Sequence, residues 1–323
     1  MKQAFKQPAV SVVMPLYNKE HEVIRAIKSV LSQTFTDFEL VVVNDGSTDN
    51  GPDIVKAIED PRIKVIDQDN SGVSAARNRG IAEAHSELIA FLDADDEWSP
   101  DYLESIFELT KHFPQCSVLG TSYFFVNENG IKRPALIRGL PEGFQKGVLK
   151  DYFGIAAKSD PPLCASAVVV NKTAISDVKG FPVGIVSGED LLTWARLASK
   201  FDIAYSVEPK AFFWKSDSFS IRPSRRPNIP DLVGYELSLL LKEGKAEQFN
   251  NIKKYIALWH RMRANFFMQL GERMYSLNEI TKAFRYSPSL KLCVLFFIAL
   301  LPFNFSRQFI RFVKKSRCQK RRK

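Results

Sequence analysis

The chain has 323 residues, of which 45% are apolar and 25% charged, and its formal net charge is +9. These proportions are typical of a globular protein and exclude a disordered one, and the length allows about two domains at roughly 150 residues each. Nine basic and no acidic residues lie between Arg307 and Lys323, so residues 1–306 are formally neutral. A neutral body argues against a broad nucleic-acid surface and confines any attraction to anionic partners to the tail.

Strands and helices alternate in the first part of the chain. Apolar, β-branched runs predict strands at residues 9–17, 38–45, 62–68 and 87–95, and the intervening patterns predict helices at 19–33, 74–85 and from Pro100. Such alternation indicates βαβ units and a mostly parallel sheet with helices on both faces. Sheets of this kind bind ligands beyond the carboxyl ends of their strands.

The later chain has a different pattern. It predicts two strands around a turn near residues 127–130, a strand leading into a helix at 163–175, a helix at 188–200, one or two strands at 202–220, and helices from about 229. We therefore predict three parts: a first domain over 1–228, a helical region over 229–290, and an anchor over 291–323.

The anchor prediction rests on the sequence of residues 291–323. The apolar run 292–303 would span about 18 Å as a helix, less than the roughly 30 Å of a bilayer core. A helix after it would have apolar side chains on one face and basic ones on the other: Phe305, Phe309, Phe312 and Val313 against Arg307, Arg311, Lys314 and Lys315. This pattern is typical of a segment lying on an anionic membrane surface. A core-packing helix with a solvated tail, or a tail that binds RNA, is the alternative.

The segment "IAFLDADDEW" at residues 89–98 places three aspartates at the end of an apolar strand. Strand geometry would direct Asp93 and Asp95 to one side and Asp96 to the other. Two like charges on one side favour a cation between them. The alternative is a solvated loop in which Asp96 or Ser99 caps the helix from Pro100.

Several common sites are absent from the sequence. There is no GxGxxG after the first strand, no GxxxxGK[ST] and no GxSxG, which excludes the usual dinucleotide, P-loop and serine-hydrolase signatures. Cys116, Cys164, Cys293 and Cys318 show no CxxC spacing, and the histidines show no HxH or HExxH, so neither a zinc site nor a disulfide framework is indicated. No signal-peptide pattern opens the chain, and we predict a reducing, cytoplasmic location.

Five segments in order resemble the family 2 glycosyltransferases: "SVVMPLYNKE", "ELVVVNDGSTDN", "NSGVSAARNRGI", "LIAFLDADDEW" and "SGEDLLTWARL". The resemblance covers roughly residues 9–220. It implies the GT-A fold, a Rossmann-like α/β arrangement with a mostly parallel sheet and helices on both faces, followed here by the helical C-terminal region. It also implies an inverting enzyme that uses a nucleotide-sugar donor.

The resemblance implies a divalent cation, Mg²⁺ or Mn²⁺, held by Asp95 and Asp93, with Asp95 as the direct ligand. Oxygen ligands suit such cations. The nucleotide-sugar site implied by the family comprises Pro15, Tyr17, Asn18, Asp45, Ser47, Arg77, Asp93 and Ala94. Tyr17 would stack on the base and Asp45 would accept a hydrogen bond from a uracil N–H. As alternatives, Asp45 and Ser47 only form turns, Arg77 pairs with Asp93 rather than the diphosphate, and Asn70 and Gly72 only shape their loop.

The acceptor-side motif "GEDLLTWARL" implies a general base, for which we choose Asp190 with Glu189 as the alternative. Both acids could instead only begin a helix. A lid over residues 214–227 would bring Lys215, Arg222, Arg225 or Arg226 to the diphosphate, unless it is a plain basic loop. The QxxRW motif of processive members is absent, so we expect transfer of one or a few sugars.

The prediction is an enzyme of the hexosyl- or N-acetylhexosaminyltransferase type. It would move a sugar from a nucleoside diphosphate, in particular UDP, to a hydroxyl of a saccharide or lipid-linked saccharide, as in bacterial surface polysaccharide synthesis. It would lie peripherally on the inner face of the cell membrane, with no nucleic-acid partner, and its oligomeric state stays open. The alternatives are a non-catalytic nucleotide-sugar or RNA-binding protein and a nucleotidyltransferase on a similar fold.

Overall fold

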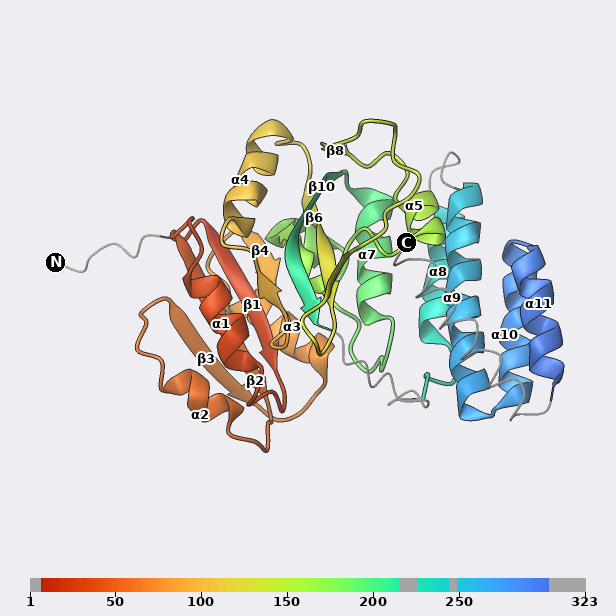
Figure 1. Cartoon of the computed structure of the whole chain (residues 1–323), viewed down its shortest axis with the longest axis horizontal. Coiled ribbons are helices and arrows are strands. Elements are labelled where there is room, and N and C mark those ends of the chain that lie inside the picture. The colour runs from red at the N-terminus through yellow and green to blue at the C-terminus, as the bar shows by residue number, and fades with distance from the viewer. Residues whose placement is uncertain (1–6, 215–225, 244–248, 302–323) are drawn as a thin grey trace. The chain divides into compact units, whose positions relative to one another are not determined.

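The computed structural model describes residues 7–214, 226–243 and 249–301. The chain divides into two compact units, residues 1–217 and 218–323. Figure 1 shows the strands in the first unit and a set of helices in the second. None of the helices that the structure describes is long and apolar enough to span a bilayer.

The described strands of the first unit form one ten-stranded sheet in the order β3-β2-β1-β4-β9-β6-β10-β5, with β7 paired to β6 and β8 to β10. The strands are β1 Val10–Leu16, β2 Phe38–Asp45, β3 Ile63–Gln68, β4 Leu88–Phe91, β5 Glu97–Trp98, β6 Val118–Val126, β7 Lys132–Pro134, β8 Lys146–Val148, β9 Val168–Asn171 and β10 Ile203–Trp214. Pairs β3-β2, β2-β1, β1-β4 and β6-β10 are parallel. The mostly parallel, helix-covered sheet is therefore confirmed.

Strand β9 interrupts the parallel order because it lies antiparallel to both β4 and β6. The run predicted to end in the aspartates also differs: β4 stops at Phe91, and Asp93 to Asp96 form a turn closed by a hydrogen bond from Asp96 N to Asp93 O at 3.0 Å. The prediction that strand geometry sets the directions of these three carboxylates is therefore wrong, because they lie in a turn.

The helices of the first unit are α1 Val23–Leu31, α2 Gly51–Lys56, α3 Val73–Glu83, α4 Tyr102–His112, α5 Tyr152–Lys158, α6 Lys172–Asp177 and α7 Glu189–Lys200, with a 3₁₀ turn η1 at Ala165–Ala167. Alternate residues of β1 divide them between the two faces. Val12 and Met14 belong to the apolar core formed with α1 and α4. Val13 faces Gly80 of α3, and its register partner Phe91 packs against Trp194 of α7. Two acid-bearing ends, those of β4 and α7, thus belong to elements packed together.

The second unit is helical in its described part, as predicted. Its helices are α8 Leu232–Glu243, α9 Phe249–Leu270, α10 Arg273–Tyr286 and α11 Leu290–Leu300. Gly271, at φ +81°, separates α9 from α10. Ala264, Ile280 and Ala299 bring α9, α10 and α11 together in one apolar cluster.

Candidate functional site

The acidic turn after β4 separates one buried from two partly exposed carboxylates. Asp96 is 1% exposed; its Oδ2 accepts from Ser166 Oγ at 2.5 Å and its Oδ1 from Trp214 N at 2.9 Å. Burial, with the charges of Asp95 and Asp93, raises the pKa of Asp96 well above its ordinary value. Asp96 thus ties the turn to η1 and β10, and it does not cap α4.

Asp95 lies beside a cation that sequence reasoning missed. Its Oδ2 is 2.6 Å from Lys19 Nζ, and both side chains are about one-third exposed. Its carbonyl oxygen accepts from Arg25 Nη2 at 2.5 Å. Lys19 follows the "PLYN" segment directly, so its place beside a predicted nucleotide loop was the available signal.

Arg77 of α3 joins the acidic turn to the start of α7. Its Nη2 donates to Asp93 Oδ1 at 2.7 Å, and its Nη1 lies 3.6 Å from Glu189 Oε1. The guanidinium is buried over the Phe181 ring, 5.1 Å from the ring centre. The alternative in which Arg77 pairs with Asp93 is therefore observed in this structure, and the role of Arg77 toward a diphosphate stays a prediction. The same cation also faces the acceptor-side motif.

The two acids at the start of α7 share this environment. Burial, then the neighbouring Asp190, raises the pKa of Glu189 to about 7, against the opposing effect of Arg77. Burial also raises the pKa of Asp190, whose Oδ1 accepts from Leu191 N at 2.7 Å. Both groups are therefore better proton acceptors than ordinary carboxylates, and both also begin a helix.

The "PLYN" and "NDGST" segments contact one another where β1 and β2 end. Asn18 N donates to Ser47 Oγ at 3.1 Å, and Thr48 N donates to Asn18 Oδ1 at 2.8 Å. Pro15 lies within β1 opposite Val43, whereas Tyr17 is 44% exposed at the strand end. The exposed ring is available for stacking, which stays a prediction.

Asp45 organises the neighbouring loop. Its Oδ1 accepts from Gln68 Nε2 and Ser71 N at 2.8 and 2.9 Å, and its Oδ2 accepts from Gly72 N at 2.9 Å. The loop-forming alternative is therefore observed, while the predicted contact with a uracil N–H would need the remaining acceptor capacity of Oδ2. A Cβ on Gly46, at φ +68°, would meet Asn70 N at 2.8 Å.

The remaining predicted residues fall into three groups. Ala94 is buried in the acidic turn. Arg226 pairs with Glu272 at 2.8 Å, within the second unit. Lys215, Arg222 and Arg225 lie outside the described residues, as does the basic tail from 307 on.

The acidic turn fits the predicted divalent cation. Asp93 and Asp95 supply hard oxygen ligands on one short, partly exposed turn, and such cations commonly take one or two carboxylates together with substrate phosphates. In this structure Arg77 and Lys19 supply the compensating positive charge. These two residues could hold Mg²⁺ or Mn²⁺ only together with further ligands from a donor.

Comparison with known proteins places this chain in a family. The profile described as Glycosyl transferase family 2 matches residues 11–164. TuaG of Bacillus subtilis, a putative teichuronic acid biosynthesis glycosyltransferase, is 31% identical over 204 residues, which are 62% of this chain and 76% of TuaG. The chain belongs to glycosyltransferase family 2. The resemblance inferred from the five segments is thus confirmed.

Other relatives match over smaller shares of their own length. An uncharacterized glycosyltransferase of Rickettsia conorii is 34% identical over 62% of this chain and 32% of itself. The putative glycosyltransferase EpsH of B. subtilis is 46% identical over 31% of this chain and 29% of itself. The family 2 chain thus spans about a third of the length of these relatives.

A solved structure confirms the fold. Residues 1–349 of S. aureus TarS, in complex with UDP-GlcNAc, match with a TM-score of 0.64 and 21% identity over 93% of this chain and 87% of that one. At this identity the likeness concerns the fold alone. Together with the observed sheet order, it confirms a GT-A-like α/β domain followed by helices.

Proposed function

We propose that this family 2 chain is an inverting glycosyltransferase that moves a sugar from a nucleoside diphosphate to an acceptor hydroxyl. The observation that carries the proposal is the position of Arg77 between Asp93 and Glu189. One buried guanidinium thereby links the turn expected to bind the donor to the helix start expected to serve the acceptor.

Asp190 is the proposed general base. It would accept the proton of the acceptor hydroxyl while the acceptor oxygen bonds to C1 of the sugar and the bond from C1 to the diphosphate breaks. A single displacement of this kind inverts the anomeric centre. Asp190 is preferred because Glu189 Oε1 lies 3.6 Å from Arg77 Nη1 and is paired with that cation. Burial raises the pKa of both acids, which suits either of them to accept a proton.

Asp95 and Asp93 are the proposed ligands of a divalent cation. When bound, Mg²⁺ or Mn²⁺ would offset the charge on the departing diphosphate. Arg77 would keep Asp93 oriented, and Lys19 would leave Asp95 for the donor phosphates. Tyr17, Asn18, Asp45 and Ser47 would form the nucleotide pocket together with Pro15 and Ala94.

A UDP-sugar is the proposed donor, with a hexose or N-acetylhexosamine as the sugar. The solved structure of TarS with UDP-GlcNAc supports this choice, and the name of TuaG supports a cell-surface saccharide as the acceptor. A lipid-linked saccharide is proposed because of the exposed apolar surface on the last described helix.

Helix α11 supports the proposed membrane-surface anchor. Leu290, Val294 and Phe297 form a stripe along α11 and are 80%, 47% and 67% exposed, and Leu301, just after the end of the helix, is 44% exposed. Nine basic residues follow in the sequence between positions 307 and 323. An apolar stripe followed by basic residues suits an anionic lipid surface, to which each cation contributes about 1 kcal/mol.

The donor test is calorimetric titration of the purified chain with UDP, GDP and CDP, with Mn²⁺ and again with excess chelator. We expect metal-dependent binding of UDP, lost in Asp95→Ala. Asp190→Asn should retain UDP binding and lose transfer by a factor of about 10³ or more, measured with a panel of UDP-sugars. Absence of nucleotide binding under both conditions, or full transfer by Asp190→Asn, would contradict the proposal.

The membrane test is sedimentation of the full chain with vesicles. Binding to vesicles rich in anionic lipid should exceed binding to zwitterionic vesicles, fall with salt, and weaken in a Val294→Ser, Phe297→Ser double variant. Met274→Ser is the matched control, because Met274 is 76% exposed in the same unit but lies outside the stripe. Equal vesicle binding by the double variant and the control would show that α11 does not contribute to membrane binding.

A further inference from the structure

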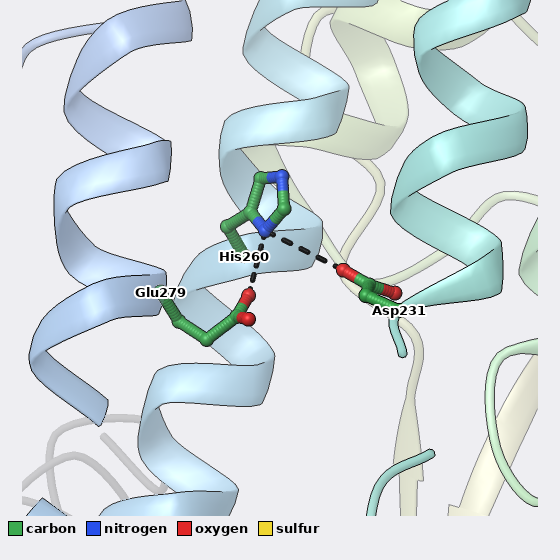
Figure 2. Close-up of side chains that lie close together, drawn as sticks. All are labelled: Asp231, His260 and Glu279. Atoms are coloured by element: carbon green, nitrogen blue, oxygen red, sulfur yellow. Dashed lines mark hydrogen bonds and ion pairs between the residues drawn. The ribbon is translucent and has the colours of Figure 1, made fainter. Parts of the chain in front are cut away.

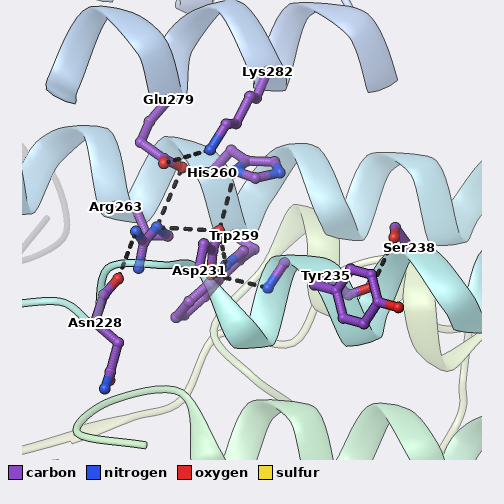
Figure 3. Close-up of polar contacts among 10 residues, drawn as sticks. Asn228, Asp231, Tyr235, Ser238, Trp259, His260, Arg263, Glu279 and Lys282 are labelled. Atoms are coloured by element: carbon purple, nitrogen blue, oxygen red, sulfur yellow. Dashed lines mark hydrogen bonds and ion pairs between the residues drawn. The ribbon is translucent and has the colours of Figure 1, made fainter. Parts of the chain in front are cut away.

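A polar pocket lies wholly within the helical second unit. Its volume is about 550 Å³, and it is lined by Asp231, Gly234, Tyr235, Ser238, His260, Lys282, Arg285 and Tyr286. These residues come from the start of α8, from α9 and from α10. Figure 3 shows Tyr235 and Ser238 on one side and the ion pairs on the other. None of the sequence predictions used this pocket.

Two carboxylates and a histidine lie against the pocket. His260 Nδ1 is 2.7 Å from Glu279 Oε2 and 3.7 Å from Asp231 Oδ2, and Figure 2 shows both carboxylates on the Nδ1 side of the ring. Within the described residues this is the one group of three such side chains whose ligand atoms lie within 4.8 Å. It therefore has to be tested first as a metal site.

The charges around this group do not suit a metal ion. Arg263 Nε lies 3.2 Å from both Asp231 Oδ2 and Glu279 Oε2, the same oxygens that a metal would need. Trp259 Nε1 also donates to Asp231, at 3.1 and 3.2 Å. A divalent cation would thus meet a buried guanidinium and an already hydrogen-bonded carboxylate. The group is an internal ion-pair network.

The charged side chains around the pocket leave it with a net positive charge. Arg263 and Lys282, whose Nζ is 3.1 Å from Glu279 Oε1, offset the two carboxylates. Arg285 adds an exposed positive charge at the wall, with no ion pair to a carboxylate in the described part of the chain. An anionic group would therefore be attracted here rather than a cation.

Histidine and tyrosine side chains add hydrogen-bonding and stacking surfaces. The Nδ1–H of His260 points at Glu279, because a carboxylate only accepts, and Nε2 is thereby left on the far side of the ring (Figure 2). Tyr286 stacks on the imidazole with ring centres 5.8 Å apart. Tyr235 is 61% exposed, and Ser238 lies one turn further along α8. Aromatic faces and hydroxyls suit a hydroxylated carbon chain.

We propose that this pocket binds an acidic saccharide unit, whose carboxylate or phosphate group pairs with Arg285 and Lys282 while its hydroxylated carbons lie against Tyr235 and Tyr286. The volume accommodates one or two sugar residues. The site belongs to the second unit alone, so the inference stands or falls independently of the proposed sugar transfer.

The test is titration of the full chain with three probes, glucuronic acid, sorbitol 6-phosphate and glucose, followed by calorimetry or saturation-transfer NMR. We expect one or both acidic probes to bind and the neutral sugar to bind at least tenfold more weakly; the two acidic probes tell carboxylate from phosphate. Arg285→Gln and Tyr235→Ala should each weaken acidic-probe binding at least fivefold. Both side chains are exposed, so neither change should disturb folding.

Lys291→Gln is the matched control, since it removes an exposed cation of the same unit outside the pocket. It should bind the acidic probes as the parent does. Saturating UDP should also leave binding unchanged, which separates this site from the donor site. Equal binding by the parent and Arg285→Gln, or no binding of either acidic probe, would overturn the proposal, as would Mn²⁺ binding that Glu279→Gln abolishes and Asp95→Ala retains.

Discussion

The ammonium group of Lys19 lies 2.6 Å from Asp95 Oδ2, where it occupies the neighbourhood of the carboxylate predicted to bind the metal. Lys19 and a divalent cation would compete for this oxygen, and a partly exposed pair contributes up to about 1 kcal/mol. Lys19→Gln should therefore strengthen Mn²⁺ binding in the absence of nucleotide by up to about fivefold. Electron paramagnetic resonance of free Mn²⁺ measures this directly.

Lys28→Gln is the control, because Lys28 is exposed on α1 and its substitution removes the same charge from the protein surface. It should leave Mn²⁺ affinity unchanged. Weaker binding in Lys19→Gln would show that Lys19 positions Asp95 instead of competing with the metal.

Glu189 should make the first unit less stable as the pH rises. Its folded-state pKa of about 7 exceeds the ordinary 4.5, so its contribution is fully present below pH 4.5 and is lost as the pH rises through 7. The loss corresponds to up to about 3 kcal/mol. Glu189→Gln should therefore be more stable than the parent at pH 8 and similar to it at pH 4. Thermal unfolding across this range provides the measurement.

Glu87→Gln serves as the comparison, since Glu87 is an exposed acid of the same unit. Its unfolding temperature should follow that of the parent at every pH. A Glu189→Gln variant that is less stable than the parent at pH 8 would mean that the pairing with Arg77 outweighs burial.

Local pattern predicted much of this fold, because most of its elements have a clear apolar period. The strands β1, β2 and β3 and the helix α7 lie where the sequence placed them. The antiparallel insertion of β9 between β4 and β6 could not be foreseen, since a strand's neighbours depend on long-range pairing. The end of β4 was missed because a turn closed between Asp93 and Asp96, which apolar periodicity does not encode.

The candidate site likewise combines features that local sequence predicts with features that depend on long-range contacts. The candidate acids could be named from the sequence because their residue types and order carried the signal, whereas their contact partners lie elsewhere in the chain. Ser166, which donates to Asp96 across 70 positions of sequence, had no local feature to mark it. Lys19 was visible in the first motif, but its pairing with Asp95 depends on β1 and β4 being neighbours. Spatial adjacency of sequence-distant groups is therefore what the structure added.

Gly46 should tolerate a side chain less well than Gly130. Both have positive φ, at +68° and +73°, so alanine costs each about 1–2 kcal/mol. A Cβ at Gly46 would also meet Asn70 N at 2.8 Å, whereas a Cβ at Gly130 has nothing within 4 Å. Gly46→Ala should therefore lose about 1–3 kcal/mol more stability in urea than Gly130→Ala and bind UDP more weakly. Equal losses would imply that the loop around Asn70 moves aside freely.

Glu279 should stabilise the helical unit most near neutral pH. Its hydrogen bond from His260 and the charge of Arg263 outweigh its burial and lower its pKa to about 2. The contribution is therefore present above the ordinary value of 4.5 and is lost as the pH falls through 2, with a size of about 3 kcal/mol. Glu279→Gln should lower stability at pH 7 by about this amount, and the difference from the parent should shrink towards pH 2. Urea unfolding followed by far-ultraviolet circular dichroism tests both ends of the range. Glu272→Gln, which breaks the more exposed pair with Arg226, should cost much less stability under the same conditions. If the two variants lost equal stability at pH 7, the buried network would have no more effect than a surface ion pair.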